Sequence, residues 1–137
     1  MIALTRRYRF AAAHALRRED RDEPWNERVY GKCANPSGHG HDYGLEITVA
    51  GEVDPRNGQL FDRDQLDALV LDQVLDRFGH SHLNDDPAFA ARVPTAENIA
   101  LVIGETLAPA IQAQGARLAR VRLEETRKNS FEIGDPR

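Results

Sequence analysis

Apolar and polar residues alternate in four parts of the chain, which is the period of a β-strand with one buried face. The first part covers residues 4–14, and the second covers residues 43–49, before an Asn-Gly turn signal. Residues 121–125 alternate in the same way, and Phe131 and Ile133 indicate a short last strand. The apolar face of the first stretch is formed by Leu4, Tyr8, Phe10, Ala12 and His14.

Apolar residues at helical spacing predict two helices between the second and third strands. Asp62 is the N-cap expected for the first helix, which should end at Gly79. Thr95 is the N-cap expected for the second helix, which Pro109 should kink or shorten and Gly115 should close. Two helices therefore follow the first two strands and precede the last two.

The order strand, strand, helix, helix, strand, strand predicts an α+β fold, in which an antiparallel sheet carries the helices on one face. No repeat, low-complexity tract or long linker divides the chain, so we expect one domain over residues 1–137. Residues 20–26 are polar and contain Pro24, and we expect them to form a loop.

Composition and charge narrow the classes of function. The 137 residues are 41% hydrophobic and carry a formal net charge of -4, which is typical of a soluble globular protein and argues against a nucleic-acid partner. No apolar run is long enough to span a membrane, and residues 1–10 lack the apolar centre of a signal peptide. Cys33 is the single cysteine, so no intrachain disulfide can form, as suits a reducing cytoplasm.

The segment Gly38-His39-Gly40-His41 is the clearest candidate for a metal site. Residues two apart in a strand project from the same face, so both imidazoles can bind one ion. Taken alone, the pair is equally compatible with two ordinary polar histidines. His14 lies on the apolar parity of its own strand and could join them. Three neutral imidazoles leave a fourth position open, which is the pattern of catalytic zinc.

Two further residues are candidates for acid–base chemistry. Cys33 lies in a loop that leads into His39, where a nearby cation would lower the pKa of its thiol, or it is a small buried hydrophobic residue. His80 follows the predicted end of a helix and can act as a general acid or base, or it is part of a polar junction, as His82 is expected to be. Sequence spacing does not place His80 beside Cys33.

The sequence suggests different roles for two carboxylates, Glu97 and Glu125. Glu97 lies in the first turn of its predicted helix, where the helix dipole favours a negative charge and no ligand is needed to explain it. Glu125 shares the inward parity of Val121 and Leu123, and an inward carboxylate is costly unless it is paired. A cationic or hydrogen-bond-donating ligand at Glu125 is therefore one interpretation.

A set of short motifs in this order resembles the 6-pyruvoyl-tetrahydropterin synthase family, which includes the 6-carboxytetrahydropterin synthases of queuosine biosynthesis. The resemblance covers nearly the whole chain, and its motifs are specific as a set. They are Phe10-Ala-Ala-Ala-His14, Gly31-Lys-Cys33, Gly38-His-Gly-His41-Asp-Tyr43, Gly51-Glu-Val-Asp-Pro55, His80 before Leu83-Asn84, Pro94-Thr-Ala-Glu97-Asn98 and Glu125-Thr126.

The resemblance implies a T-fold, an antiparallel four-stranded sheet with two helices. Trimers of such chains would close the sheets into a barrel, and two trimers would stack into a homohexamer with active sites at the subunit interfaces. The resemblance also implies Zn²⁺ (Zn2+) as cofactor, held by His14, His39 and His41, with a small-molecule pterin as the partner.

The resemblance further implies a lyase acting on 7,8-dihydroneopterin triphosphate. Zinc would acidify the side-chain hydroxyls of this substrate, Cys33 would move protons on its carbon skeleton with His80 as partner, and triphosphate would be eliminated. Glu125 would anchor the pterin ring, with help from Thr95 and Glu97.

Two features bear on which member of the family this chain resembles. Five residues separate Cys33 from His39, as in the 6-pyruvoyl enzymes, although the queuosine enzyme remains an alternative. The family usually has Asp before the catalytic histidine, where this chain has Gly79, so a zinc-containing pterin-binding protein with weak turnover is a further alternative. Asp76, four residues before His80, is a candidate replacement if both share a helix face. A purely structural zinc module lacks an obvious fourth ligand.

Overall fold

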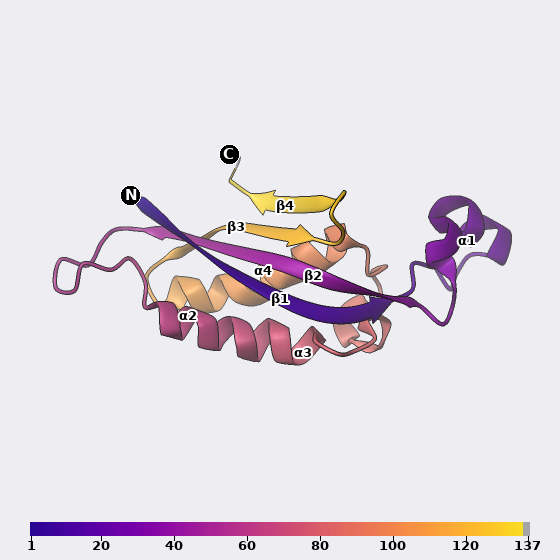
Figure 1. The fold of residues 1–137 in the computed structure, drawn as a ribbon, viewed down its shortest axis with the longest axis horizontal. Coiled ribbons are helices and arrows are strands. Elements are labelled where there is room, and N and C mark those ends of the chain that lie inside the picture. Colours follow the sequence, from indigo (N-terminus) through magenta and orange to yellow (C-terminus); the bar gives the residue numbers. More distant parts are fainter. Residues whose placement is uncertain (136–137) are drawn as a thin grey trace.

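Four strands form one antiparallel sheet in the order β1-β2-β3-β4 in the computed structural model, which describes residues 1–135. The strands are β1 (Ile2–His14), β2 (His39–Gly51), β3 (Arg117–Glu124) and β4 (Ser130–Gly134). Two long helical segments cover one face of the sheet, as Figure 1 shows. The predicted α+β class, with an antiparallel sheet that carries helices on one face, is therefore confirmed.

The first long helical segment consists of α2 (Arg63–Val70), a π-helical turn (Leu71–Leu75) and α3 (Asp76–Phe78). The Asp62 side chain accepts hydrogen bonds from the backbone N–H groups of the first turn, as its expected N-cap role requires. Four apolar residues spaced four apart are fully buried along this segment: Leu66, Val70, Val74 and Phe78. In a regular α-helix, residues four apart are offset by about 40° around the helix axis, so a stripe with this spacing would wind away from the core. The wider π-helical turn offsets this rotation.

The second long helix, α4 (Ala96–Ala113), begins after the N-cap Thr95, whose hydroxyl accepts from the Asn98 N–H. The helix continues past Pro109 to Ala113, so the expected shortening at this proline is wrong. Gly115 follows with a φ of +87°, as expected for the residue that closes a helix. None of the helices within residues 1–135 is long and apolar enough to cross a membrane.

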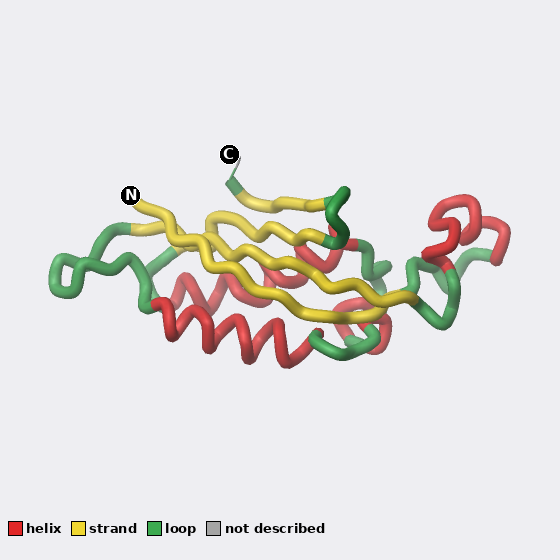
Figure 2. The backbone as a smooth tube through the Cα atoms, viewed as in Figure 1, coloured by secondary structure: helices red, strands yellow, loops and turns green. Residues whose placement is uncertain are grey.

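Residues 20–26 do not form the expected loop throughout, because α1 (Glu23–Tyr30) begins inside them. The Asp22 carboxylate caps this helix by accepting from the Trp25 N–H at 2.9 Å. Pro24 lies in the first turn, where a missing N–H costs nothing. The 3₁₀ turn that carries Cys33 (Gly31–Ala34) follows directly, and the whole unit projects beyond one end of the sheet (Figures 1 and 2).

The core lies between the sheet and the two long helical segments, and β2 runs through its centre. Alternate residues of β2 from Tyr43 to Val49 are almost wholly buried. The register pairs His14 with His39 and Ala12 with His41. The inward-facing positions of both strands therefore extend past the core to the end of the sheet. There they are occupied by histidines instead of aliphatic residues.

Candidate active site

Three histidines meet at the end of β1 and the start of β2. His14 is the last residue of β1, and His39 and His41 have the same facing parity on β2. The ligand atoms of the three imidazoles lie within 4.8 Å of one another, and the Nε2 atoms of His14 and His39 are 3.0 Å apart. The structure thus brings together the three residues that the sequence analysis singled out for a metal.

The ring of His14 is fixed on the side away from this cluster. Its Nδ1 atom lies 2.7 Å from the carbonyl oxygen of Pro94, which can only accept, so Nδ1 carries the proton and Nε2 keeps its lone pair. The pKa of His14 is lowered to about 4, mainly by burial and to a smaller extent by the neighbouring imidazoles of His39 and His41, while the hydrogen bond to Pro94 opposes this change. Burial also lowers the pKa of His39. Both rings are therefore neutral at pH 7, as metal ligands must be.

The donor set fits zinc. Structural surveys place zinc about 2.0–2.1 Å from each imidazole nitrogen, which corresponds to nitrogens about 3.3 Å apart in a tetrahedral site. The Nε2 atoms of His14 and His39, 3.0 Å apart, are near this value, and all three ligand atoms lie within 4.8 Å of one another. A carbonyl that holds the second ring nitrogen, as Pro94 holds that of His14, is the usual support for a metal-binding histidine.

Glu125 faces the histidine cluster from just beyond the end of β3, one residue past the strand in which we expected it. Its side chain is only 16% exposed, and Oε2 lies 3.8 Å from Nε2 of His14. Burial raises the pKa of Glu125, the positive charge of a protonated His41 would lower it, and Glu97 raises it. Glu125 and Glu97 therefore act on each other in the fold, while Thr95 uses its hydroxyl to cap α4.

Tyr43 packs against the histidine cluster and was not recognised as a site residue from the sequence. Its fully buried ring stacks on Phe10, with 5.0 Å between ring centroids, and meets His41 and His14 edge to face. Its hydroxyl lies 3.4 Å from Nδ1 of His14. The sequence pattern did indicate this position, because Tyr43 follows His39 and His41 at two-residue spacing and therefore faces the same side of β2.

Cys33 and His80 are not brought together within one chain. The Cys33 carbonyl accepts from the Leu16 N–H, whereas the His80 N–H donates to the Ala11 carbonyl. These two anchor points are five residues apart along β1 and its extension, which corresponds to about 15 Å in extended chain. The expected catalytic pair therefore does not form inside a single copy of the protein.

His80 belongs to a short segment that runs beside the free edge of β1. The Ser81 carbonyl accepts from the Ala13 N–H at 2.9 Å, and His82 forms a parallel bridge with Ala13. His80 has a φ of +56°, a strained conformation for a residue with a side chain, of the kind that concentrates at functional sites.

His80 and His82 border a hollow of about 550 Å³ at this edge of the sheet. Ala11, Ala13, Gly40 and Asp42, which also line the hollow, have the parity that points away from the helices. Ala12 and His41, of the opposite parity, line it as well, so the hollow that His80 borders reaches one histidine of the cluster.

The proposed replacement of the missing family Asp by Asp76 is wrong. The helix ends at Phe78, and Gly79 has an extended ψ of 136°, so Asp76 and His80 do not share a helix face. Gly79 also leaves no room for the family residue, because a Cβ atom there would lie 2.4 Å from the Leu75 carbonyl oxygen. A carboxylate at position 79 would require the backbone to move.

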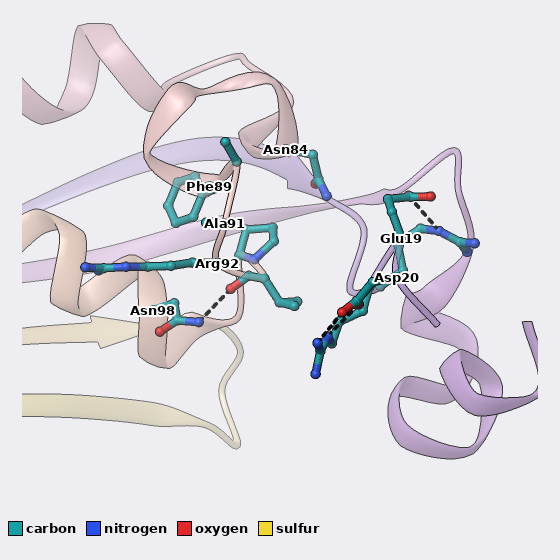
Figure 3. Close-up of a pocket in the computed structure, with 12 residues that line it drawn as sticks. Glu19, Asp20, Asn84, Phe89, Ala91, Arg92 and Asn98 are labelled. Atoms are coloured by element: carbon teal, nitrogen blue, oxygen red, sulfur yellow. Dashed lines mark hydrogen bonds and ion pairs between the residues drawn. The ribbon is translucent and has the colours of Figure 1, made fainter. Parts of the chain in front are cut away.

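A cavity of about 820 Å³ lies between the loop that follows β1 and the start of α4, and Pro94, whose carbonyl holds His14, is part of its lining. Figure 3 shows Glu19 and Asp20 on one side of it and Asn84, Phe89 and Asn98 on the other. Its arginines are all engaged by carboxylates: Arg17 by Glu19 and Glu23, Arg18 by Asp20, and Arg92 by Glu105. The lining therefore offers no uncompensated cationic site.

Comparisons with known proteins agree with this geometry. A sequence model of 6-pyruvoyl tetrahydropterin synthase matches residues 3–136. The 6-pyruvoyl tetrahydrobiopterin synthase of Poecilia reticulata is 37% identical over 92% of this chain and 85% of its own, and that of Homo sapiens is 34% identical over 92% and 86%. The structure of Caenorhabditis elegans 6-pyruvoyl tetrahydropterin synthase superimposes with a TM-score of 0.89 at 34% identity, covering 98% of this chain and 96% of that one.

The T-fold expected from the sequence is confirmed by this superposition, whereas the Plasmodium falciparum enzyme, at 14% identity and a TM-score of 0.67, supports the fold alone. The family match spans almost the entire chain, and the relatives are matched over most of their own length. The chain therefore belongs to the 6-pyruvoyl tetrahydropterin synthase family.

Proposed function

We propose that this protein is a zinc-dependent lyase that converts 7,8-dihydroneopterin triphosphate to 6-pyruvoyl-tetrahydropterin and releases triphosphate. The observation that carries the proposal is the cluster of His14, His39 and His41 with the buried carboxylate of Glu125 directly beside it. Relatives named as 6-pyruvoyl tetrahydrobiopterin synthases support the same reaction. The single cysteine suits the cytoplasm, where we place the enzyme.

In this proposal the three imidazoles hold one Zn²⁺, with His14 fixed by the Pro94 carbonyl. When bound, the ion supplies a Lewis acid that lowers the pKa of the side-chain hydroxyls of the substrate. Because His14 and His39 are neutral at pH 7, both imidazoles can bind the ion without first losing a proton. Three protein ligands would leave a fourth position of the ion open to the substrate.

Glu125 orients the pterin ring. A carboxylate accepts two hydrogen bonds, which matches the adjacent N–H donors of a pterin, and its partial burial strengthens both bonds. Glu97, whose charge acts on Glu125, and Thr95, the N-cap of the same helix, help to delimit the ring site. The substrate side chain then reaches the histidine cluster.

Proton transfer on the substrate requires two copies of the chain. Cys33 lies on the unit that follows β1, close to His39 in sequence, whereas His80 borders the hollow at the free edge of β1. We place Cys33 and the metal ligands of one chain against His80 of another, within a homohexamer built as a dimer of trimers. In such an assembly each centre is complete only at a subunit interface.

One observation favours a weaker enzyme. No carboxylate within residues 1–135 has a described hydrogen bond to His80, and Gly79 cannot accept the family Asp without a backbone shift. His80 would then lack the group that usually orients an imidazole and stabilises its charged form. A zinc-containing pterin-binding protein with weak turnover is therefore the second candidate function.

Incubation of the zinc-loaded protein with 7,8-dihydroneopterin triphosphate, followed by mass spectrometry of the products, tests the proposal. We expect 6-pyruvoyl-tetrahydropterin and inorganic triphosphate. A 6-carboxy-tetrahydropterin together with acetaldehyde would assign the chain to the queuosine branch. Tight substrate binding without product would favour the pterin-binding protein, and neither binding nor turnover would overturn the assignment.

A further inference from the structure

The backbone next to His14 is held by a side chain rather than by a strand. Asn84 accepts a hydrogen bond from the Ala15 N–H at 2.8 Å through Oδ1, and it donates one to the Ala15 carbonyl at 2.9 Å through Nδ2. Ala15 is only 2% exposed, so water does not replace these bonds when they are lost. Figure 3 shows Asn84 beside the end of β1, across the cavity from Glu19.

The position of Asn84 matters because β1 loses its strand partner at this point. His14 is the last residue of β1 paired with β2, and Ala15 lies just beyond the pairing. On the other edge, residues 80–82 already bond to Ala11 and Ala13. The amide of Asn84 presents one donor and one acceptor, as a backbone does, and extends this row of bonds to Ala15. The backbone on both sides of His14 is thereby fixed.

We propose that Asn84 is a positioning residue for the metal centre, whose side-chain amide holds Ala15 so that His14 keeps its Nε2 atom directed at His39. The proposal rests on the proposed function only in that the histidine cluster binds a metal. His14 is fully buried and is tied through Nδ1 to Pro94, so a shift of its backbone cannot be absorbed by a free rotation of the ring. A displaced backbone therefore carries Nε2 away from the other ligands.

Helix α1 supplies a matched control for the loop that follows β1. Asn26 is fully buried and holds Arg18 in the same way, accepting from its N–H at 2.7 Å and donating to its carbonyl at 3.1 Å. Arg18 is four residues beyond His14, outside the sheet. Loss of the Asn26 amide should loosen the loop without moving the metal ligand.

The test compares Asn84→Asp with Asn26→Asp, because each change keeps the shape and the acceptor but replaces the donor with an acceptor that faces a carbonyl. Metal affinity is measured by competition with a chelator, and ligand geometry by the visible absorption of the Co²⁺-loaded protein. We expect Asn84→Asp to weaken metal binding about 10–100-fold and to alter the Co²⁺ spectrum. Asn26→Asp should lower the melting temperature but leave the affinity and the spectrum unchanged.

Normal affinity and an unaltered spectrum in Asn84→Asp would overturn the proposal, as would an equal loss of affinity in both variants. If Asn84→Asp does not fold, Asn84→Ser provides the same comparison with a smaller polar side chain and the same expected loss. These measurements need no substrate. Absence of turnover in the metal-loaded native protein would therefore refute the proposed function and leave the role of Asn84 intact.

Discussion

His14 and His39 face each other across the last pair of the β1–β2 ladder, and their Nε2 atoms are 3.0 Å apart. Their placement is set by backbone hydrogen bonds of a sheet, and His41 follows on the same strand. Sites built on regular elements are held more precisely than sites built on loops. The three imidazoles, our proposed metal ligands, are therefore largely preorganised before any ion binds.

Replacement of one ligand should remove the metal but not the fold. We expect about one zinc per native chain and much less than one in His39→Ala, because two imidazoles bind zinc far more weakly than three. Metal analysis of the purified proteins measures this directly. His80→Ala is the control and should keep its metal, since His80 is not one of the three clustered histidines. Full zinc content in His39→Ala would disprove the ligand assignment.

Cys33→Ala and His80→Ala should each keep their metal and lose at least about a hundredfold in turnover, the usual scale for a removed acid–base group. If each centre combines Cys33 of one chain with His80 of another, mixing the two inactive variants and allowing subunits to exchange should restore activity. Random mixing would give about one intact centre in four. Steady-state rates before and after exchange measure the effect, and no recovery in a verified mixed oligomer would show that the two residues act within one chain.

Glu125→Gln should weaken substrate binding more than it changes the rate of the bound complex. The substitution keeps the shape but exchanges a charged acceptor for a neutral one, which costs about 1.5–3 kcal/mol for a hydrogen bond to a charged group, or at least tenfold in affinity. Glu124→Gln is the control, because Glu124 is more exposed and lies beside Arg122. Unchanged substrate affinity in Glu125→Gln would mean that the ring binds elsewhere.

Gly38→Ala should damage the metal site, and Gly58→Ala should not. Both glycines have a positive φ, +77° and +74°, so either substitution should cost about 1–2 kcal/mol in backbone strain. A Cβ atom at Gly38 would also lie 2.6 Å from Nε2 of His82 and 2.9 Å from the His14 carbonyl, whereas nothing lies within 4 Å at Gly58. Calorimetry and metal analysis separate the two effects. Equal metal content in both variants would contradict this prediction.

Asp86 should contribute stability only above acidic pH. Its carboxylate accepts two hydrogen bonds from Arg77, which is the main reason that its pKa is lowered, and one from the Ala88 N–H. A lowered folded-state pKa gives stability that is present above the unfolded value and lost as pH falls through the folded one. Asp86→Asn should therefore lower the melting temperature by about 3 °C at pH 7, equivalent to about 1 kcal/mol, and have little effect well below pH 4.

The matched control for Asp86 is Asp135, which pairs with Arg117 through the same two-bond geometry but is 49% exposed, against 13% for Asp86. Asp135→Asn should change the melting temperature less at every pH, because solvent screens an exposed pair. Equal, pH-independent changes in both variants would show that burial of the Arg77–Asp86 pair contributes nothing.

Parity and spacing were sufficient to predict the sheet, both long helices and the meeting of the three histidines. Alternation placed His14, His39 and His41 on buried faces of strands, and pairing of neighbouring strands did the rest. The helix that begins at Glu23 was missed because Pro24 was interpreted as a breaker, although proline is well tolerated in a first turn.

The surroundings of the site were less predictable because they depend on contacts distant in sequence. Pro94 reaches His14 across 80 positions, and Asn84 reaches Ala15 across 69. Neither contact leaves a periodic trace in the sequence. The relation assumed between Asp76 and His80 failed for a local reason, since the helix ends two residues before His80.

The π turn at Leu71–Leu75 indicates how this helix can change length during evolution. The buried residues from Leu66 to Phe78 follow one another at intervals of four positions. Removal of one residue between Val70 and Val74 would shorten the middle interval to three, which gives the alternation of three and four that is regular in an α-helix. The wide turn thus accommodates a single inserted residue as a bulge without rotating Phe78 or the segment of His80 that follows. Insertions and deletions between relatives are expected to be tolerated here, in the middle of a core helix, where they are normally excluded.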